Sequence, residues 1–334
     1  MVYVRGQNAS MITTVVGSYP KVPNRPRPAR LRNAINRFDR GEITEEELHQ
    51  VEDEVTIEVL EEQADAGLDL ITDGQIRWED EQTYLTRKLA GVSINGLTRW
   101  FDTNMYYRQP VIEASLAWRE PITLQDYHFA VEHSSRPVKP VLTGPYTLTR
   151  LSRNGAYDSL EGCVLALAEA LNQEARALQQ AGASFIQFNE PAILRHKEDL
   201  PLLRAASERL LQGVDVETAV YLYFGDVAGI YPQVLDLPFD LIGLDFVMGA
   251  ANYQLLRQSP FTKKLGLGLM DARNTKLEQV EDIVDKIRLA SAFVPPNRIH
   301  VSPSAGLEFL PREVAQAKLV RLVEGVRRAE EVLS

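Results

Sequence analysis

The chain has a single cysteine, Cys163, among its 334 residues. One thiol cannot form an internal disulfide, and it cannot build a metal site from several thiolates. Cys163 lies in the segment EGCVLALAEAL, whose apolar residues recur at helical spacing. We therefore expect Cys163 to be a small core residue and not a nucleophile.

Long apolar runs and an excess of positive charge are also missing. No window approaches the roughly 20 apolar residues of a membrane span, and the first residues contain no apolar stretch of signal-peptide length. The formal net charge of -10 works against binding to a nucleic-acid backbone. The sequence thus predicts a cytoplasmic protein that has neither nucleic acid nor a membrane as a partner.

Short apolar runs alternate with helical patterns along the chain, as expected for parallel strands that are joined by crossover helices. Several runs are apolar throughout, which is typical of strands buried on both faces. Eight such units indicate an α/β fold, the (β/α)8 TIM barrel. The expected strands are residues 13–16, 70–72, 138–142, 185–188, 219–223, 241–244, 265–269 and 299–301.

Helix signals separate these strands. Residues 43–67 combine a Thr44 cap, a glutamate three positions later and a terminating Gly67, and residues 160–183 end in the same way at Gly182. Further helices are expected over 277–294 and 311–333. We expect one barrel domain over 1–334, with an insertion at about 91–137 between strands two and three that serves as a lid or contacts substrate. The basic, proline-rich residues 21–38 are expected to form a solvated surface loop.

Polar side chains follow the expected strands at their carboxyl ends, where the active sites of barrels lie. They are acidic and aromatic and include no histidine, so we expect a small polar or cationic ligand. No Ser-His-Asp or Cys-His arrangement and no dinucleotide or phosphate-loop glycine pattern is found. Glu190 precedes a proline at a strand end; proton transfer, ammonium binding and a buried structural role all stay open for it.

Six segments, in this order, resemble the motifs of the C-terminal catalytic barrel of cobalamin-independent methionine synthase and its shorter single-barrel relatives. They are TTVVGSYP, GLDLITDGQIRWEDEQTYL, TGPYTL, IQFNEPAI, GLGLMDARN and SPSAGLEFLPREVAQAKL. The resemblance covers nearly the whole chain. It implies a barrel methyltransferase of methionine biosynthesis and one-carbon metabolism, in which zinc presents a substrate thiolate to the methyl donor.

The zinc ligands of that family do not all have counterparts here. The family uses a His-x-Cys pair at the end of strand five, a carboxylate at the end of strand six and a cysteine after strand eight. The matching positions are Tyr221, Tyr223, Asp245 and Ala305, of which only Asp245 keeps a possible ligand. We therefore expect no zinc. The resemblance implies Tyr221, Tyr223, Asp245 and Glu190 as the catalytic residues of a zinc-free reaction.

The family's amino-acid subsite is also changed in charge. Two acidic residues that hold the substrate ammonium in the family correspond to Gln75 and Asn189, whereas Ser18, which matches a contact to the substrate carboxylate, is retained. We expect a small-molecule substrate bound by Ser18, Gln75, Trp78, Asn189, Asp226, Asp271 and Ser304.

Three functions follow as alternatives. The first is methyl or one-carbon transfer to or from a small amino-acid-like or thiol substrate, with methylcobalamin, carried by a corrinoid protein partner, or methyl-folate as the donor. Because methyl-folate is a tertiary amine that needs protonation and a thiolate nucleophile, we expect donor or acceptor to differ from the family's. The second is a lyase or decarboxylase that reuses the pocket for acid-base chemistry. The third is a non-catalytic ligand-binding homologue.

Overall fold

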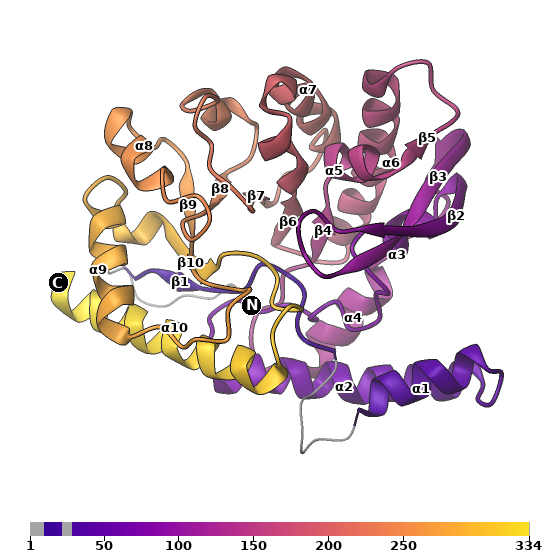
Figure 1. Cartoon of the computed structure of the whole chain (residues 1–334), viewed down its shortest axis with the longest axis horizontal. Helices are drawn as coiled ribbons and strands as arrows, with labels where there is room; N and C mark the ends of the chain where they lie inside the picture. The colour runs from indigo at the N-terminus through magenta and orange to yellow at the C-terminus, as the bar shows by residue number, and fades with distance from the viewer. Residues whose placement is uncertain (1–9, 22–28, 334) are drawn as a thin grey trace. The chain divides into compact units, whose positions relative to one another are not determined.

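The computed structural model describes residues 10–21 and 29–333. The chain divides into two compact units. The first unit comprises Met1–Arg77, Phe129–Val138 and Leu265–Ser334, and the second unit comprises Trp78–His128 and Lys139–Lys264. Their helices and strands are labelled in Figure 1. The expectation of a single domain stays a prediction.

Parallel strands form the core of the first unit. β1 pairs with β10, and β10 pairs with β9. Leu70 and Ile71 make isolated parallel bridges to Thr14 and Val138, at the place of the second predicted strand. The elements of this unit are β1 (Ile12–Thr13), α1 (Arg30–Asp39), α2 (Glu45–Asp65), β9 (Lys264–Met270), α9 (Val280–Ser291), η4 (Pro296–Arg298), β10 (Ile299–Pro303) and α10 (Arg312–Leu333).

A parallel sheet with the order β4-β6-β7-β8 forms the core of the second unit. Its side chains are buried on both faces, in agreement with the unbroken apolar runs of the sequence. The elements around it are α3 (Thr83–Arg87), β4 (Val141–Thr143), α5 (Pro145–Leu151), α6 (Leu160–Gln180), β6 (Phe185–Asn189), η1 (Pro191–Arg195), η2 (Lys197–Asp199), α7 (Leu200–Leu210), β7 (Glu217–Leu222), η3 (Gln233–Asp236), β8 (Leu241–Asp245) and α8 (Asn252–Gln258). Each of the eight predicted strands is therefore present as a strand or as a pair of bridges.

The insertion is an antiparallel hairpin followed by a helix. The hairpin consists of β2 (Ala90–Arg99) and β3 (Tyr106–Ala117), the short β5 (Arg153–Asn154) pairs with β3, and α4 (Leu124–His133) follows (Figure 1). Glu174 of α6 holds the segment after the hairpin. Its buried carboxylate accepts hydrogen bonds from Trp118 Nε1 at 2.8 Å, from Ile122 N at 2.8 Å and from Thr123 N at 2.7 Å.

Helix ends follow the signals in the sequence. α2 begins with a capping box: Thr44 Oγ1 accepts from Glu47 N at 3.2 Å, and the Glu47 carboxylate accepts from Thr44 N at 2.8 Å. Gly67 and Gly182, which follow α2 and α6, have φ values of +88° and +94°, a region that favours glycine. Cys163 is buried in α6, as predicted. No helix in the described ranges is long and apolar enough to cross a membrane.

Loss of the Thr44 cap is expected to weaken the fold measurably. The substitution Thr44→Ala removes the hydroxyl that accepts the Glu47 N–H, so we expect the free energy of unfolding to fall by about 1 kcal/mol. A urea titration followed by circular dichroism measures this change. Thr44→Ser keeps the acceptor and serves as the control. Equal losses in both variants would contradict a capping role.

The prediction of a surface loop over 21–38 is wrong for its second half. Residues 22–28 lie outside the described residues, but Arg30–Asp39 form helix α1. Leu31 and Ala34 are buried on one face of this helix, and Arg30 Nη1 lies 2.6 Å from Glu54 of α2. Helical spacing of apolar residues therefore outweighs the basic composition that suggested a solvated loop.

Candidate functional site

Ser18 lies in the loop after β1 of the first unit. Its hydroxyl donates a short hydrogen bond to the carboxylate of Glu308, and its carbonyl oxygen accepts from Leu307 N at 2.9 Å. A Cβ atom added to Gly306 would overlap both Ser18 Oγ and Glu308, so only glycine allows this close approach. Burial raises the pKa of Glu308. Ser18 is thus tied to an acidic partner that was not in the predicted site.

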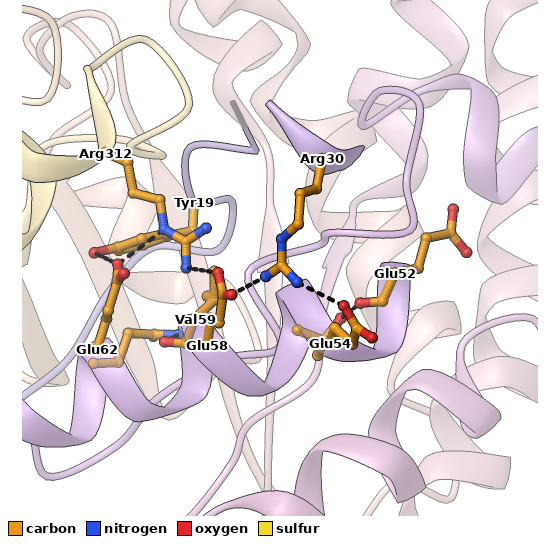
Figure 2. Close-up of polar contacts among 10 residues, drawn as sticks. Tyr19, Arg30, Glu52, Glu54, Glu58, Val59, Glu62 and Arg312 are labelled. Carbon is orange, nitrogen blue, oxygen red and sulfur yellow. Dashed lines mark hydrogen bonds and ion pairs between the residues drawn. The ribbon is translucent and has the colours of Figure 1, made fainter. Parts of the chain in front are cut away.

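Tyr19 links this loop to the loop that carries Gln75. Tyr19 N donates to Gly74 O at 3.0 Å, and the Tyr19 hydroxyl donates to Glu62 at 3.1 Å. Figure 2 shows that Glu62 also accepts from Arg312, whose guanidinium reaches Glu58 as well. Arg312 and Glu62 are buried, and Glu58 is partly exposed at the edge of this ion-pair network. It holds the Ser18 loop beside Gly74, the neighbour of Gln75.

Gln75 itself is almost fully buried and has a φ value of +52°. A positive φ is uncommon for a residue other than glycine and indicates a backbone that the surroundings hold in place. The Gln75 N–H donates to Asp73 Oδ1 at 3.1 Å. The loop after the second predicted strand is therefore a tightly fixed turn.

Asp271 and Ser304 lie in the loops after β9 and β10. Ser304 N donates to Met270 O at 2.8 Å, and Ser304 Oγ accepts from Ala272 N at 3.3 Å. Asp271 N donates to Glu278, whose carboxylate also binds the buried Lys318. The structure thus brings these two predicted residues into adjacent loops.

Trp78 and Asp226 belong to the second unit. The Trp78 ring is buried and stacks on Tyr84 with ring centroids 4.9 Å apart. Asp226 forms an ion pair with Lys197 at 3.1 Å and accepts from Ala228 N at 2.9 Å. Partial burial acts to raise the pKa of Asp226, but these two partners outweigh it and hold the pKa below its usual value. Both residues have well-defined structural partners.

Asn189 and Tyr221 form one row at the carboxyl ends of β6 and β7. In the register of the sheet Asn189 lies opposite Tyr221, which in turn lies opposite Gly243 of β8. A Cβ atom on Gly243 would collide with the Tyr221 ring. Glycine at this position is therefore required for the tyrosine ring to lie over β8.

Tyr223 follows Tyr221 by two residues and lies one residue beyond the end of β7. The Tyr223 hydroxyl donates to Glu81 Oε2 at 3.2 Å, and Glu81 O accepts from the Thr143 hydroxyl at 2.7 Å. The pair couples a hydroxyl to a carboxylate. Glu81 was not among the predicted site residues, although it lies in the family motif GLDLITDGQIRWEDEQTYL.

The tip of the β2-β3 hairpin reaches the strand ends of the second unit. The rings of Phe101 and Phe224 are 5.5 Å apart, and the guanidinium of Arg195 lies 5.1 Å from the Phe101 ring. Arg195 also forms an ion pair with Asp102. Phe101 and Phe224 both have positive φ values, +47° and +72°. The role of the insertion as a lid or in substrate contact stays a prediction.

Asp245 is the last residue of β8 and is buried. Its Oδ1 accepts from Val247 N at 2.8 Å and from Met248 N at 2.9 Å, and its Oδ2 accepts from Phe224 N at 3.1 Å. Three backbone N–H groups thus bind the charged carboxylate. The arrangement joins the loop after β8 to the loop after β7.

Glu190 is buried in a similar way at the end of β6. Its two oxygens accept from Tyr146 N at 2.9 Å and from Thr147 N at 2.7 Å, at the start of α5. Gly144 leaves the space that the carboxylate occupies. Burial nevertheless raises the pKa of Glu190 to about 7. A carboxyl group with this pKa can change its charge near neutral pH.

The residues at the family's zinc positions do not fit a zinc ion. Tyr221 and Tyr223 carry phenol hydroxyls in place of an imidazole and a thiol, Ala305 has no ligand atom, and both oxygens of Asp245 already bind backbone N–H groups. Within 10–21 and 29–333, no three His, Cys, Asp or Glu side chains form a group that could hold a metal. These four positions offer one carboxylate, whose oxygens are already hydrogen-bonded, whereas zinc needs four nitrogen, sulfur or oxygen ligands.

Sequence comparison places these residues in a known family. Residues 11–328 match the family model described as "Cobalamin-independent synthase, Catalytic domain". The chain is 33% identical to a methionine synthase of Saccharolobus solfataricus, with 96% of this chain and 95% of the relative covered. It is 31% identical to a methionine synthase of Sulfurisphaera tokodaii, with 96% and 93% covered.

Solved structures show the same fold. A B12-independent methionine synthase from Shewanella sp. W3-18-1, in complex with selenomethionine, superposes with a TM-score of 0.84 at 23% identity and covers 97% of this chain and 99% of its own. A methyltransferase from Methanosarcina mazei gives a TM-score of 0.67 at 13% identity, with 98% and 96% covered. The predicted (β/α)8 barrel is confirmed.

Fold and family together define an enzyme of the barrel methyltransferase class. The chain belongs to the cobalamin-independent methionine synthase family, and the match covers the catalytic domain. The family is cobalamin-independent, so its members require no corrinoid. The comparisons do not support the predicted corrinoid protein as a partner.

Proposed function

We propose that this protein is a zinc-independent methyltransferase that moves a methyl or other one-carbon group to or from a small amino-acid-like or thiol substrate. The observation that carries the proposal is the setting of Asp245, the one carboxylate at a family zinc position. It binds three backbone N–H groups, and the neighbouring positions carry Tyr221 and Tyr223. Family membership supports methyl transfer, and this donor set supports independence from zinc.

The choice of donor follows from the missing thiolate activation. A metal-bound thiolate is a strong nucleophile at neutral pH, and a free thiol is a weaker one. Methylcobalamin and methyl-folate are the two candidate donors, and the family's independence of cobalamin favours methyl-folate. Its leaving amine must take up a proton. The Tyr223 hydroxyl, which donates to Glu81, can supply this proton, and the acceptor returns its own proton to the Tyr223–Glu81 pair as it takes the methyl group.

Tyr221 and Tyr223 are therefore our candidates for the reacting side chains. Glu190 and Asp245 act by positioning loops, because their oxygens accept backbone N–H groups from neighbouring loops. The alternative of a lyase or decarboxylase uses Tyr221, Tyr223, Asp245 and Glu190 as its acid-base groups. The carboxylates of Asp245 and Glu190 already accept backbone N–H groups.

Metal analysis combined with a methyl-transfer assay tests the proposal. Purified protein is expected to contain no stoichiometric zinc by mass spectrometry. It is expected to form a methylated product from methyl-folate and one of a panel of thiols and amino acids, at a rate that a chelator does not change. We expect Tyr223→Phe to lower this rate by about 100-fold.

Tyr157→Phe is the matched control for that variant. The Tyr157 hydroxyl accepts from Leu116 N at 2.8 Å, beside the hairpin and outside the strand-end loops, so the rate should stay unchanged. Stoichiometric zinc together with loss of activity on chelation would show that the reaction depends on zinc. Methyl transfer from methylcobalamin alone would exclude methyl-folate as the donor. Release of carbon dioxide without any methylated product would favour the decarboxylase.

A further inference from the structure

Lys139 is a buried lysine two residues before β4 and has no role in the proposed chemistry. It is 1% exposed, and its Nζ donates to Gln187 Oε1 at 2.6 Å. Its Nζ also lies 5.3 Å from the ring centroid of Tyr221 and 5.7 Å from that of Phe185. Among the described residues it has no carboxylate within ion-pair distance. Aromatic faces favour a cation, while burial lowers the pKa of Lys139.

Gln187 continues the hydrogen-bond chain along β6. Gln187 and Asn189 are two residues apart on the strand, so their side chains lie on the same face. Gln187 Nε2 donates to Asn189 Oδ1 at 2.8 Å. A chain of hydrogen bonds thus runs from Lys139 through Gln187 to Asn189, at the carboxyl end of the strand.

The donors and acceptors of this chain run in one direction. Lys139 Nζ donates to Gln187 Oε1, and Gln187 Nε2 donates to Asn189 Oδ1. The chain therefore occupies the amide oxygen of Asn189. The amide nitrogen Nδ2 of Asn189 is a donor that the chain does not use.

Asn189 Nδ2 is available to a ligand. No hydrogen bond from this atom to another described residue is present, although the residue is only 1% exposed. It lies at the end of β6, opposite Tyr221 in the sheet.

We propose that Lys139, acting through Gln187, is a specificity-determining positioning residue that makes Asn189 a hydrogen-bond donor to the substrate. The subsite at the end of β6 then binds a carboxylate or carbonyl oxygen and disfavours an ammonium group. The inference rests on the proposed function for the small amino-acid-like substrate, and it specifies which end of that substrate Asn189 contacts.

Hydrogen bonding at Asn189 favours an acceptor as the ligand. The Nδ2 group can donate to a carboxylate or carbonyl oxygen. An ammonium at the same place would meet another N–H donor. We expect a preference of about tenfold or more for the carboxylate, as for other hydrogen bonds to charged groups.

Two probes that differ only at their charged end test this preference. 3-(Methylthio)propanoate carries a carboxylate, and 3-(methylthio)propylamine carries an ammonium. Their dissociation constants are measured by calorimetry on the full-length protein. The wild type is expected to bind the carboxylate at least about tenfold more tightly. Equal or tighter binding of the amine, or binding of neither probe at millimolar concentration, would overturn the proposal.

Variants separate a positioning role from a structural one. Lys139→Met is close in size and cannot donate, so Gln187 and Asn189 can turn around; the preference should fall toward onefold. Asn189→Asp should reverse it. In an Asn189→Ala background, Lys139→Met should have no further effect on the ratio, because Lys139 acts through Asn189. A merely structural lysine would weaken both probes equally and leave the ratio unchanged, which would contradict the proposal.

The controls use a lysine of the same unit and a second break in the chain. Lys264→Met removes the lysine that pairs with Glu217 at 2.8 Å, and it should leave the ratio unchanged. Gln187→Leu interrupts the hydrogen-bond chain at its middle, and it should show the same fall in preference that we expect for Lys139→Met. It replaces Lys139→Met as the test if Lys139→Met does not fold. The binding titrations need no turnover. A failed methyl-transfer assay would therefore contradict the proposed function without affecting the measured probe preference. A missing probe preference would contradict the role of Lys139 without affecting the methyl-transfer assay.

Discussion

Replacing Asp245 with alanine is expected to destabilise the second unit by about 3–5 kcal/mol, one of the two largest effects that we predict. The substitution leaves the N–H groups of Val247, Met248 and Phe224 without their acceptor. Asp245 is buried and its three donors are partly buried. Each donor that loses its partner costs at most about 1–3 kcal/mol, so the three losses together account for the size of the effect. The free energy of unfolding from a urea titration measures it.

Phe224 makes this position especially sensitive. Its φ value of +72° is unfavourable for a residue with a side chain, and the bond from its N–H to Asp245 helps to hold it. Asp245→Asn is the matched control: its oxygen can still serve Val247 and Met248, but its amide nitrogen would face the Phe224 N–H. We expect an intermediate loss. Unchanged stability of Asp245→Ala, together with loss of a bound metal, would show that Asp245 is a metal ligand.

Glu190 is expected to make the stability of the protein depend on pH between about 4.5 and 7. The carboxyl group loses its proton near pH 4.5 in the unfolded chain, but burial raises the pKa of Glu190 to about 7 in the folded protein. Between these values the folded state binds more protons, so stability falls as the pH rises. The whole change amounts to about 3 kcal/mol, because one pKa unit corresponds to about 1.4 kcal/mol.

Glu190→Gln isolates this contribution. Glutamine does not titrate. The unfolding free energy of the wild type minus that of the variant should therefore fall by about 3 kcal/mol as the pH rises from about 4.5 to 7. Urea titrations at several pH values provide the measurement, and all other titrating groups cancel in the difference. If the wild-type value minus the variant value rises with pH instead, the hydrogen bonds from Tyr146 N and Thr147 N outweigh burial and lower the pKa of Glu190.

The strands were largely predictable because each one is a short apolar run between helix signals. β6, β7, β8 and β10 contain their predicted ranges except at the edge of β7, where Tyr223 lies one residue beyond the strand. The hairpin was not predictable in the same way. Its residues are largely exposed or half-buried, so the sequence shows no apolar run, and its anchor, Glu174, lies on a helix far along the chain.

The candidate site was predictable as a set of positions and less so as a set of roles. Strand ends and family motifs located Asn189, Glu190 and Asp245. The partners that decide what these side chains do are backbone N–H groups and a lysine, which carry no motif. Glu190 binds N–H groups 43 and 44 residues away in the sequence. A charged residue two positions before a buried strand, as in KPVLTG, was the available signal for Lys139.

The burial of Cys163 has a practical consequence for spectroscopy. The thiol is inaccessible, and burial raises its pKa to about 11, so almost none of it is thiolate at neutral pH. Maleimide dyes should therefore leave the natural chain unlabelled without prior removal of its cysteine. A new cysteine at Leu97, a 67% exposed position on β2, would be the preferred site of labelling. Fluorescence could then follow the hairpin alone while ligands are added.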